Sequence, residues 1–354
     1  MTAMTAGSIP YIIAFAYASD FASFPGTKLI AADRIWVPGF MRGDGMAGHP
    51  RQVLETSSYY YEDNANPSGV ILGKIPLDGT IKFTTDIVDG IPAYLLLGKA
   101  TADTPAANSW RLQGSINGDV PKLIADVENN LMNDAAKCAR QMEDVKCIKG
   151  VFHAKKGWLQ MDMEFLARVE HLGQPRSTYL PDLRGTHAPK VFYDIRGNSA
   201  LTLTWHSLNL GKWLVDFNSA VENEIANYTQ EDNVAYASVH HVGGRRKYSC
   251  PAFKFVQKED SDLHLHDMHE HVNGSTMSDL VLTVPRRHAT DTAVIRWKNV
   301  YLKSWEFEPA PAENPGVKSI NAIFSEPTDI EFDETLVTAA AAAEPNHAED
   351  YEKA

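Results

Sequence analysis

Histidine is concentrated in one short segment of the sequence. Residues 264–271 read HLHDMHEH, which places four histidines and two acids within eight residues. Imidazole is a common ligand for zinc and nickel, so the segment is a candidate metal site for a metal-dependent hydrolase. Its spacing differs from the two-histidine, one-glutamate pattern of zinc peptidases. On a helix, His264 and His271 would share a face with Met268 while the other two histidines point away, which favours a solvated helix face.

Two further clusters offer weaker chemistry. The histidines at 240–241 lie near the arginines at 245–246 and could bind an anion, although a loop or subunit contact is the simpler interpretation. Asp260 and Asp262 resemble the start of a calcium loop, but the glycine and the final glutamate of that loop are missing. The chain has no Walker-type glycine loop, no dinucleotide fingerprint and no serine elbow. We therefore predict a protein that is not an enzyme, with no catalytic, cofactor-binding or metal-binding residues and no cofactor.

The negative charge of the chain is concentrated near its C-terminus. The net charge of the 354 residues is −12, and residues 326–354 hold nine acids and one lysine. The rest of the chain is nearly balanced, and its densest basic run is the short Arg245-Arg246-Lys247. Proteins that grip nucleic acid carry a basic face, so specific DNA binding is not expected.

Cysteine content and hydropathy point to a protein made in the cytosol. The three cysteines are too few and too scattered for a disulfide framework or a zinc ribbon. The apolar run 9–18 has no basic residue before it and Asp20 follows directly, so a signal peptide is not expected. No apolar stretch reaches the ~20 residues that a membrane helix needs.

A strand pattern dominates the middle of the chain and returns near its end. Between Cys147 and Arg168, apolar residues alternate with polar ones after a Lys-Lys-Gly turn, which predicts a hairpin with one buried face. Residues 293–325 repeat the strand pair around a proline-rich loop. In each half a shorter β-like run, 122–127 or 279–284, precedes the pair. We therefore predict a mainly β protein built from two copies of one unit.

The other elements are assigned by their order in each unit. Long loops are expected over 38–69 and 221–246, strands over 75–85 and 247–256, short helices over 86–98 and 260–274, and an inserted helical stretch over 129–144. The predicted domains are a first tube-type unit at 1–167, a linker at 168–190, a second unit at 191–332 and a flexible acidic tail at 333–354.

This order of elements resembles that of the tail tube (major tail) proteins of long-tailed bacteriophages and related archaeal viruses. The resemblance covers most of residues 9–332, while residues 129–144, the histidine-rich segment and the tail after Glu334 depart from it. The segments that carry it are AYASDFASFPGT, GIPAYLLLG, DVKCIKG with WLQMDMEFLAR, WLVDFNSAVENEI, and VIRWKNVYLKSWEF with SINAIFSEP.

The family resemblance implies a fold and an assembly. It implies β-sandwich or barrel-like tube domains with a flanking helix, whose inner sheets join between neighbours around a central channel, while long loops reach the adjacent ring. Most such proteins have one domain and six-membered rings, so two domains in one chain imply a trimeric ring with pseudo-sixfold symmetry. The implied location is the virion tail, assembled in the host cytoplasm. The implied partners are further copies, a tape-measure protein, a tail terminator and distal tail proteins, with genomic DNA passing through the lumen and no membrane.

Residue chemistry agrees with this expectation at one strand. Asp162 and Glu164 lie on the polar face of the predicted hairpin and would repel DNA phosphates, as a channel wall should. We expect the acidic tail on the outer surface. Three alternatives stay open: a tail terminator or baseplate tube component of the same fold, a carbohydrate-binding β-sandwich that uses Tyr59 to Tyr61 and Trp110, and the hydrolase with the 264–271 histidines.

Overall fold

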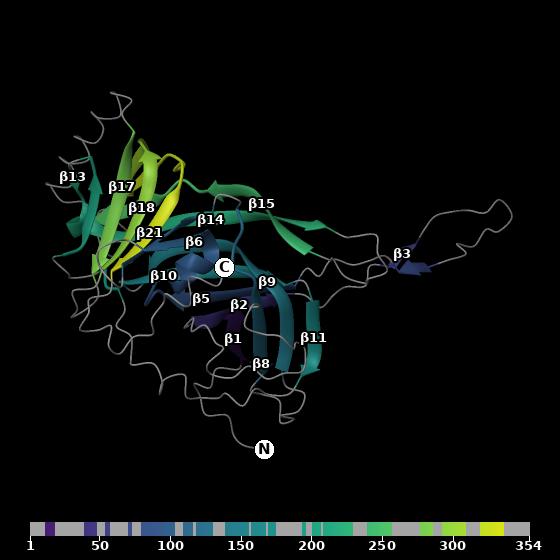
Figure 1. The fold of residues 1–354 in the computed structure, drawn as a ribbon. Coiled ribbons are helices and arrows are strands. Elements are labelled where there is room, and N and C mark those ends of the chain that lie inside the picture. The colour runs from purple at the N-terminus through teal and green to yellow at the C-terminus, as the bar shows by residue number, and fades with distance from the viewer. Residues whose placement is uncertain are drawn as a thin grey trace, which may run out of the picture.

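The chain folds almost entirely into β-strands (Figure 1). A computed structural model describes residues 11–17, 39–47, 54–56, 70–72, 79–102, 109–115, 118–129, 139–155, 157–167, 169–174, 193–195, 200–206, 208–228, 239–256, 277–285, 292–308 and 319–335. Within these ranges the regular elements are one α-helix, one turn of 3-10 helix, and strands. The mainly β class predicted from the sequence is confirmed.

The largest sheet is built on a path of eight antiparallel strands. Its order from edge to edge is β19-β20-β16-β14-β9-β10-β5-β2. The strands are β2 (Gly39–Ala47), β5 (Gly79–Asp86), β9 (Ala139–Lys155), β10 (Trp158–Ala167), β14 (Leu214–Tyr228), β16 (Ala252–Val256), β19 (Leu302–Glu308) and β20 (Ser319–Phe324).

Four more strands extend this sheet beside its main path. The N-terminal part of β9 pairs with β8 and β11, β8 also pairs with β1, and β15 pairs with β14 to form a long arm. Their bounds are β1 (Tyr11–Tyr17), β8 (Leu123–Asn129), β11 (Val169–Gln174) and β15 (Val239–Tyr248).

A second sheet of seven strands packs on the first. Its order is β13-β12-β17-β18-β21-β7-β6, and a separate small pair is formed by β3 and β4. The bounds are β3 (Leu54–Thr56), β4 (Val70–Leu72), β6 (Gly98–Ala102), β7 (Ser109–Gly114), β12 (Thr202–Trp205), β13 (Leu208–Asn209), η3 (Gly211–Trp213), β17 (Ser278–Pro285), β18 (Thr292–Val300) and β21 (Ile330–Thr335).

Aromatic side chains fill the space between the two sheets. Trp297 on β18 is fully buried, and its ring lies edge-on to Phe217 on β14 and to Phe253 on β16, at centroid distances of 6.0 and 5.3 Å. Its indole N–H donates to the Ser219 hydroxyl at 2.8 Å, so the polar handle of the ring is satisfied. The two sheets therefore form a β-sandwich with a common core.

The predicted hairpin at 147–168 is confirmed. In β10, Leu159, Met161, Met163 and Phe165 are buried while Asp162, Glu164 and Leu166 on the other face are partly exposed. Gly157 turns the chain with a φ of 90°, a conformation that costs glycine little. Antiparallel strands need only such a short turn, so local sequence is enough to fix this element.

The helix predicted over 86–98 is shorter in the structure. α1 spans Ile91–Leu97, because Asp86 continues β5 and Pro92 occupies the first turn, where its missing N–H costs nothing. All seven helical residues are buried. The helix ends as predicted at Gly98, which takes the left-handed conformation.

The two halves of the chain repeat their irregularities as well as their strands. The pairs Leu123↔Val145 and Ala125↔Met142 between β8 and β9 have the same register shift as Ser278↔Val300 and Leu280↔Trp297 between β17 and β18. Directly before the matching valines, Asp144 and Asn299 both have a positive φ, of 50° and 54°. Asparagine and aspartate tolerate this conformation better than other side chains. The shared distortion marks β8–β9 and β17–β18 as equivalent elements.

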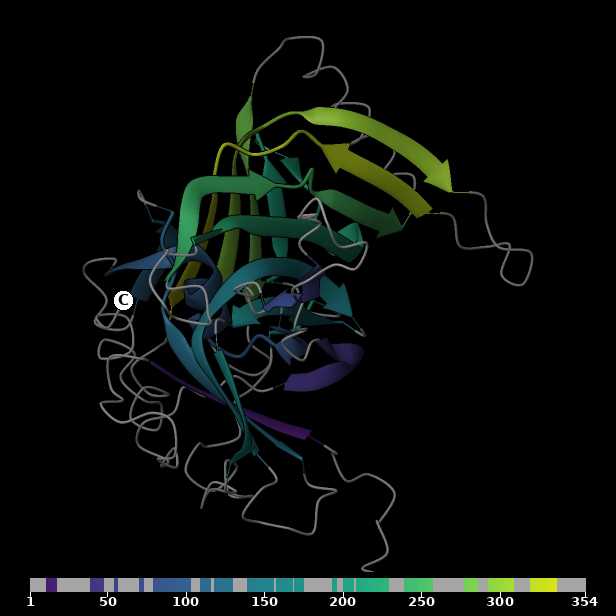
Figure 2. The ribbon, with the colours of Figure 1, turned by 90° about the vertical axis from the view of Figure 1, so that its right-hand side faces the viewer.

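The large sheet repeats in the same way. β9 shifts register against β10 next to the pair Phe165↔Cys147, and β19 shifts against β20 next to the pair Leu302↔Phe324. β5 lies beside β10 as β16 lies beside β20, and β2 lies beside β5 as β14 lies beside β16. The eight-strand path thus contains the same four-strand order twice, as β9-β10-β5-β2 and as β19-β20-β16-β14. In Figure 2 the strands of the second half lie above those of the first.

Several predicted boundaries differ from the structure. The long loop predicted over 221–246 is largely strand, because β14 and β15 continue into it as a paired arm. The loop predicted over 38–69 contains β2 and β3. Residues 139–144, expected to be helical, belong to β9. The helix predicted over 260–274, with its four histidines, lies outside the described residues, as do Asp260 and Asp262.

Strands from both halves share both sheets. β14 pairs with β9 in the large sheet, and β7 pairs with β21 in the second sheet. β11 falls within the predicted linker 168–190 and pairs with β9, while β21 extends to Thr335, so Asp333 and Glu334 are buried strand residues at the start of the predicted tail. The division into domains at 1–167 and 191–332 stays a prediction.

Candidate assembly surfaces

The eight-strand path ends in two edge strands that have paired counterparts inside the chain. Among the described residues, β2 pairs only with β5 and β19 only with β20. Their counterparts by position, β14 and β9, pair with each other over five residue pairs from Asn218↔His153 to Glu222↔Lys149. An edge strand presents unpaired N–H and C=O groups that favour pairing with another strand. The β14–β9 junction is therefore a direct example of the contact that β2 and β19 have the geometry to make.

The outward face of the large sheet is polar and mainly acidic. Lys149 forms an ion pair with Glu222 across the β14–β9 junction, and Lys82 lies 3.5 Å from Glu164. Seven acids face four lysines on the described part of this face, which leaves an excess of negative charge. The acids are Asp86, Asp162, Glu164, Asp216, Glu222, Glu224 and Glu306, and the lysines are Lys82, Lys149, Lys247 and Lys254.

Asp162 is held at the centre of this face. Its carboxylate accepts a hydrogen bond from the Thr84 hydroxyl at 2.5 Å, and His153 Nε2 lies 3.3 Å from the same oxygen. The predicted position of Asp162 and Glu164 on the polar face of the hairpin is confirmed. These short polar contacts fix the carboxylate on the sheet surface.

Two residues of the second half cap the C-terminal end of α1. Asn223 on β14 is 5% exposed, and its amide nitrogen donates to the carbonyl oxygens of Leu96 at 2.9 Å and Cys147 at 3.0 Å. Arg246 on β15 donates to the Leu97 carbonyl at 2.7 Å and to Asn223 Oδ1 at 2.8 Å. The last carbonyls of a helix have no partner within it, so this helix-capping pair satisfies buried groups that the helix leaves free.

The guanidinium of Arg246 is enclosed by both halves of the chain. It also donates to the Ser115 carbonyl at 3.3 Å, and a Cβ at Gly114 would lie 2.5 Å from one of its nitrogens. Burial lowers the pKa of Arg246, and the nearby Tyr248 and Asp329 oppose this shift. Because glycine at position 114 has no side chain, the guanidinium of Arg246 has room there. Its positive charge is also favourable next to the C-terminal end of α1, which is the negative end of the helix dipole.

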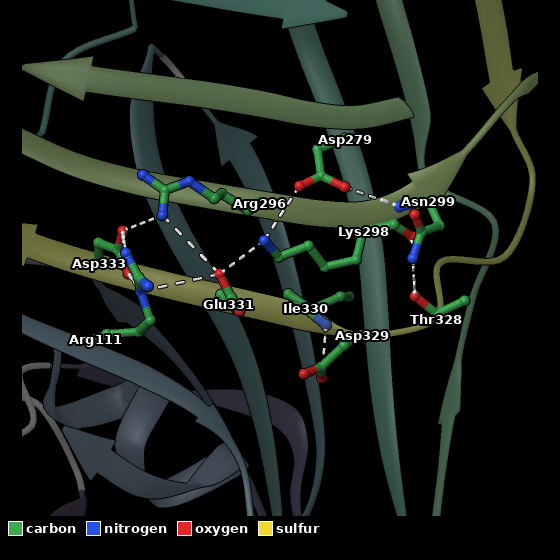
Figure 3. A network of polar contacts seen from close by, with 10 residues as sticks. All are labelled: Arg111, Asp279, Arg296, Lys298, Asn299, Thr328, Asp329, Ile330, Glu331 and Asp333. Carbon is green, nitrogen blue, oxygen red and sulfur yellow. Dashed lines mark hydrogen bonds and ion pairs between the residues drawn. The ribbon is translucent and has the colours of Figure 1, made fainter. Parts of the chain in front are cut away.

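In the second sheet, a network of ion pairs joins β7 to strands of the second half of the chain (Figure 3). Arg111 Nε lies 3.0 Å from Asp333 Oδ1, and Arg296 contacts the other oxygen of that carboxylate. Lys298 bridges Asp279 at 3.1 Å and Glu331 at 3.3 Å. These partners come from β7, β17, β18 and β21. Its three cations and three acids have balanced formal charges, and their contacts join β7 to strands of the second half.

The end of β21 contacts the start of α1. The carboxylate of Glu334 is fully buried and accepts a hydrogen bond from the Gly90 N–H at 2.5 Å, while Asp89 accepts one from the Ile91 N–H at 3.1 Å. Both carboxylates thus satisfy orphan N–H groups at the first turn. Residues from the second half hold α1 at both of its ends.

The sequence-based candidates for chemistry fall in different places. The histidines at 240–241 lie in β15 and pair along the backbone with Asn227 and Ala226, but their side chains lie outside the described set. Arg246 belongs to the helix-capping pair, so it is no free anion-binding group. Trp110, offered as an exposed aromatic for a carbohydrate-binding module, is partly buried and packs on the core, which removes that argument. Tyr59 to Tyr61 lie outside the described residues.

Among the residues that the structure describes, no group of three or more His, Cys, Asp or Glu is arranged to hold a metal ion. None of their helices has the length and apolar character required to cross a membrane.

Sequence reasoning missed the residues that join the halves. Asn223, Arg246 and Glu334 fall in a predicted loop and a predicted tail, and no local pattern marks them, because the residues that they contact at the two ends of α1 lie more than a hundred positions away. One signal is visible in the sequence: in the alternating WLVDFNSAVENEI strand, the polar residue Asn223 falls on the apolar face. A polar residue at such a position needs a buried partner.

Comparison with known proteins gives no family assignment. No family model matches the chain, and no curated protein is significantly similar to it.

Tyr248 should make the protein sensitive to alkaline pH. Burial, and then the neighbouring carboxylate of Asp329, raise the pKa of this phenol well above its ordinary value of 10.0. The folded state keeps the proton while the unfolded state loses it, so stability is intact below about pH 10 and falls by roughly 1.4 kcal/mol per pH unit above it.

The check is a comparison of wild type with Tyr248→Phe, which also loses the 2.8 Å hydrogen bond to Asp329. At pH 8 the variant should be less stable by about 1 kcal/mol in urea unfolding. This gap should narrow as the pH rises above 10. A gap that stays constant up to pH 11 would contradict the assignment.

Proposed function

We propose that this protein is a structural subunit that polymerises into the tail tube of a virus, with rings of three chains stacked around a channel for the genome. The observation that carries the proposal is the duplicated strand order of the large sheet. Its internal junction, β14–β9, joins the end of one four-strand order to the start of the next. The same strand pairing that joins the two halves within one chain could join neighbouring chains head to tail. If the rotation between neighbours closes on itself, the assembled chains form a ring.

The number of chains in the ring follows from the duplication. If each chain supplies two of six equivalent sheet units, three chains close the ring with pseudo-sixfold symmetry. Closing the sheet into a barrel would pair both edge strands and so remove the edges that otherwise promote aggregation.

The charge of the outward face supports a channel wall. DNA phosphates are repelled by an excess of carboxylates, and they bind surfaces that are rich in arginine and lysine. The face that carries Asp162, Glu164 and Glu222 has more acids than lysines and lies opposite the aromatic core. We infer that it lines the lumen, through which DNA passes without specific binding.

The remaining contacts would belong to stacking and to other tail parts. The β14–β15 arm extends from the sheet, as Figure 1 shows, and fits a contact with the adjacent ring. Ring stacking is head to tail and does not close, so it gives a filament. The expected partners are further copies, a tape-measure protein, a tail terminator and distal tail proteins in the virion.

Electron microscopy of the purified chain at rising concentration tests this function. We expect hollow filaments whose top views and mass per length give three chains per ring. Monomers at every concentration, or a sample of solid fibrils, would overturn the proposal. Closed rings that never stack would favour a terminator or baseplate component instead.

A further inference from the structure

The internal junction also specifies how two chains meet. This inference rests on the proposed function and deepens it by naming the contact residues. In the first half, Phe40↔Thr84 and Met41↔Phe83 pair β2 with β5. In the second half, Asp216↔Lys254 and Phe217↔Phe253 pair β14 with β16 in the same places. Arg42 is thus the counterpart of Asn218.

The opposite edge can be matched in the same way. His153 in β9 pairs with Gln160, and Glu308 in β19 pairs with Ser319, each three residues beyond the equivalent pairs Gly150↔Met163 and Trp305↔Ala322. Glu308 is therefore the counterpart of His153. Inside the chain, Asn218 and His153 are directly opposite each other in the antiparallel ladder.

We propose that β2 of one chain pairs antiparallel with β19 of a second copy, in the register that places Arg42 opposite Glu308. The next pair in this ladder is Gly43 with Phe307, as Ser219 pairs with Phe152 inside the chain. The pairing brings opposite charges together at a position where the internal junction has a neutral asparagine and a histidine. Opposite charges placed directly across a ladder stabilise it, and like charges destabilise it.

The backbone around Arg42 is suited to this role. β14 leaves its inner neighbour β16 after Asn218 and turns to β9, and β2 shows a register shift against β5 directly after Met41. In β14 the ladder with β16 ends at Asn218, where the ladder with β9 begins, and in β2 the regular ladder with β5 is interrupted directly before the equivalent residue, Arg42. In sequence, β19 contributes the acids Glu306 and Glu308, and β2 of the partner contributes the cation of Arg42.

Disulfide trapping tests the register in assembled filaments of the full chain. Residues opposite each other in an antiparallel pair have Cβ atoms about 4.5–5.5 Å apart, whereas diagonal neighbours are about 7–8 Å apart and beyond easy bridging. Arg42→Cys with Glu308→Cys should give disulfide-linked trimers under mild oxidation. The matched pair Arg42→Cys with Glu306→Cys, and each single variant, should give few.

Charge reversal provides a second measurement that does not depend on cysteine. Arg42→Glu should raise the concentration needed for assembly by roughly fivefold, and adding Glu308→Arg to it should restore the wild-type value. Filaments that form but cross-link better through position 306, or that are not rescued by the double reversal, would overturn this register and leave the tube function standing. A wild type that never assembles would overturn both.

Discussion

Replacing Asn223 with leucine should destabilise the protein by about 3–5 kcal/mol. The leucine removes two hydrogen bonds donated to the buried carbonyls of Leu96 and Cys147 and one accepted from Arg246. Each buried polar group left without a partner costs about 1–3 kcal/mol. Urea unfolding followed by tryptophan fluorescence measures the change.

The matched control lies on the same strand. Asn218→Leu changes an exposed residue five positions earlier on the opposite face of β14, so its effect on the free energy of unfolding should stay within about 0.5 kcal/mol. A loss of less than about 1 kcal/mol for Asn223→Leu would mean that water replaces the lost partners and that the helix-capping pair does not hold the halves together.

Replacing Gly98 with alanine should cost about 3 kcal/mol or more. Gly98 ends α1 with a φ of +85°, and a Cβ there would lie 2.0 Å from the backbone oxygen of Asp119. The left-handed conformation costs other residues about 1–2 kcal/mol, and the clash is with backbone, which cannot rotate away. A drop in the midpoint of thermal unfolding provides the readout.

The control for this variant is Lys99→Ala, one residue further on in β6. It truncates a partly exposed side chain and leaves the turn unchanged, so its midpoint should stay near that of the wild type. If Gly98→Ala unfolds at the same temperature as Lys99→Ala, the contact between the end of α1 and the segment at Asp119 is not rigid.

Sequence patterns predicted the elements that local physics determines. The alternation in β10 and the glycine stops at Gly157 and Gly98 depend on neighbours within a few residues, so strand, turn and helix end were found close to their observed places. The duplication was also visible, because both copies keep the same order of strands. A period of two and a turn residue are enough for these features.

The features that local sequence patterns do not predict depend on contacts between residues far apart in the chain. The sequence predicts a loop over 221–246, whereas β14 and β15 continue through it as a paired arm, with Asn223 buried and Arg246 partly buried against α1. The placement of β7 beside β21 likewise depends on a pairing across the whole chain. Neither the burial of a polar residue nor its distant partner can be read from local spacing.

The sharing of strands between the halves has a consequence for the order in which the protein matures. Arg111 on β7 meets Asp333 across 222 residues of sequence, and the Gly90 N–H meets Glu334 across 244. Such distant pairings form late and slowly, because long stretches of chain must first be ordered. During synthesis, β9 and β7 of the first half would lack their partners β14 and β21 until these strands emerge from the ribosome. If the protein assembles as we propose, a chain would therefore be able to join a filament only after its second half had been synthesised and had paired with the first.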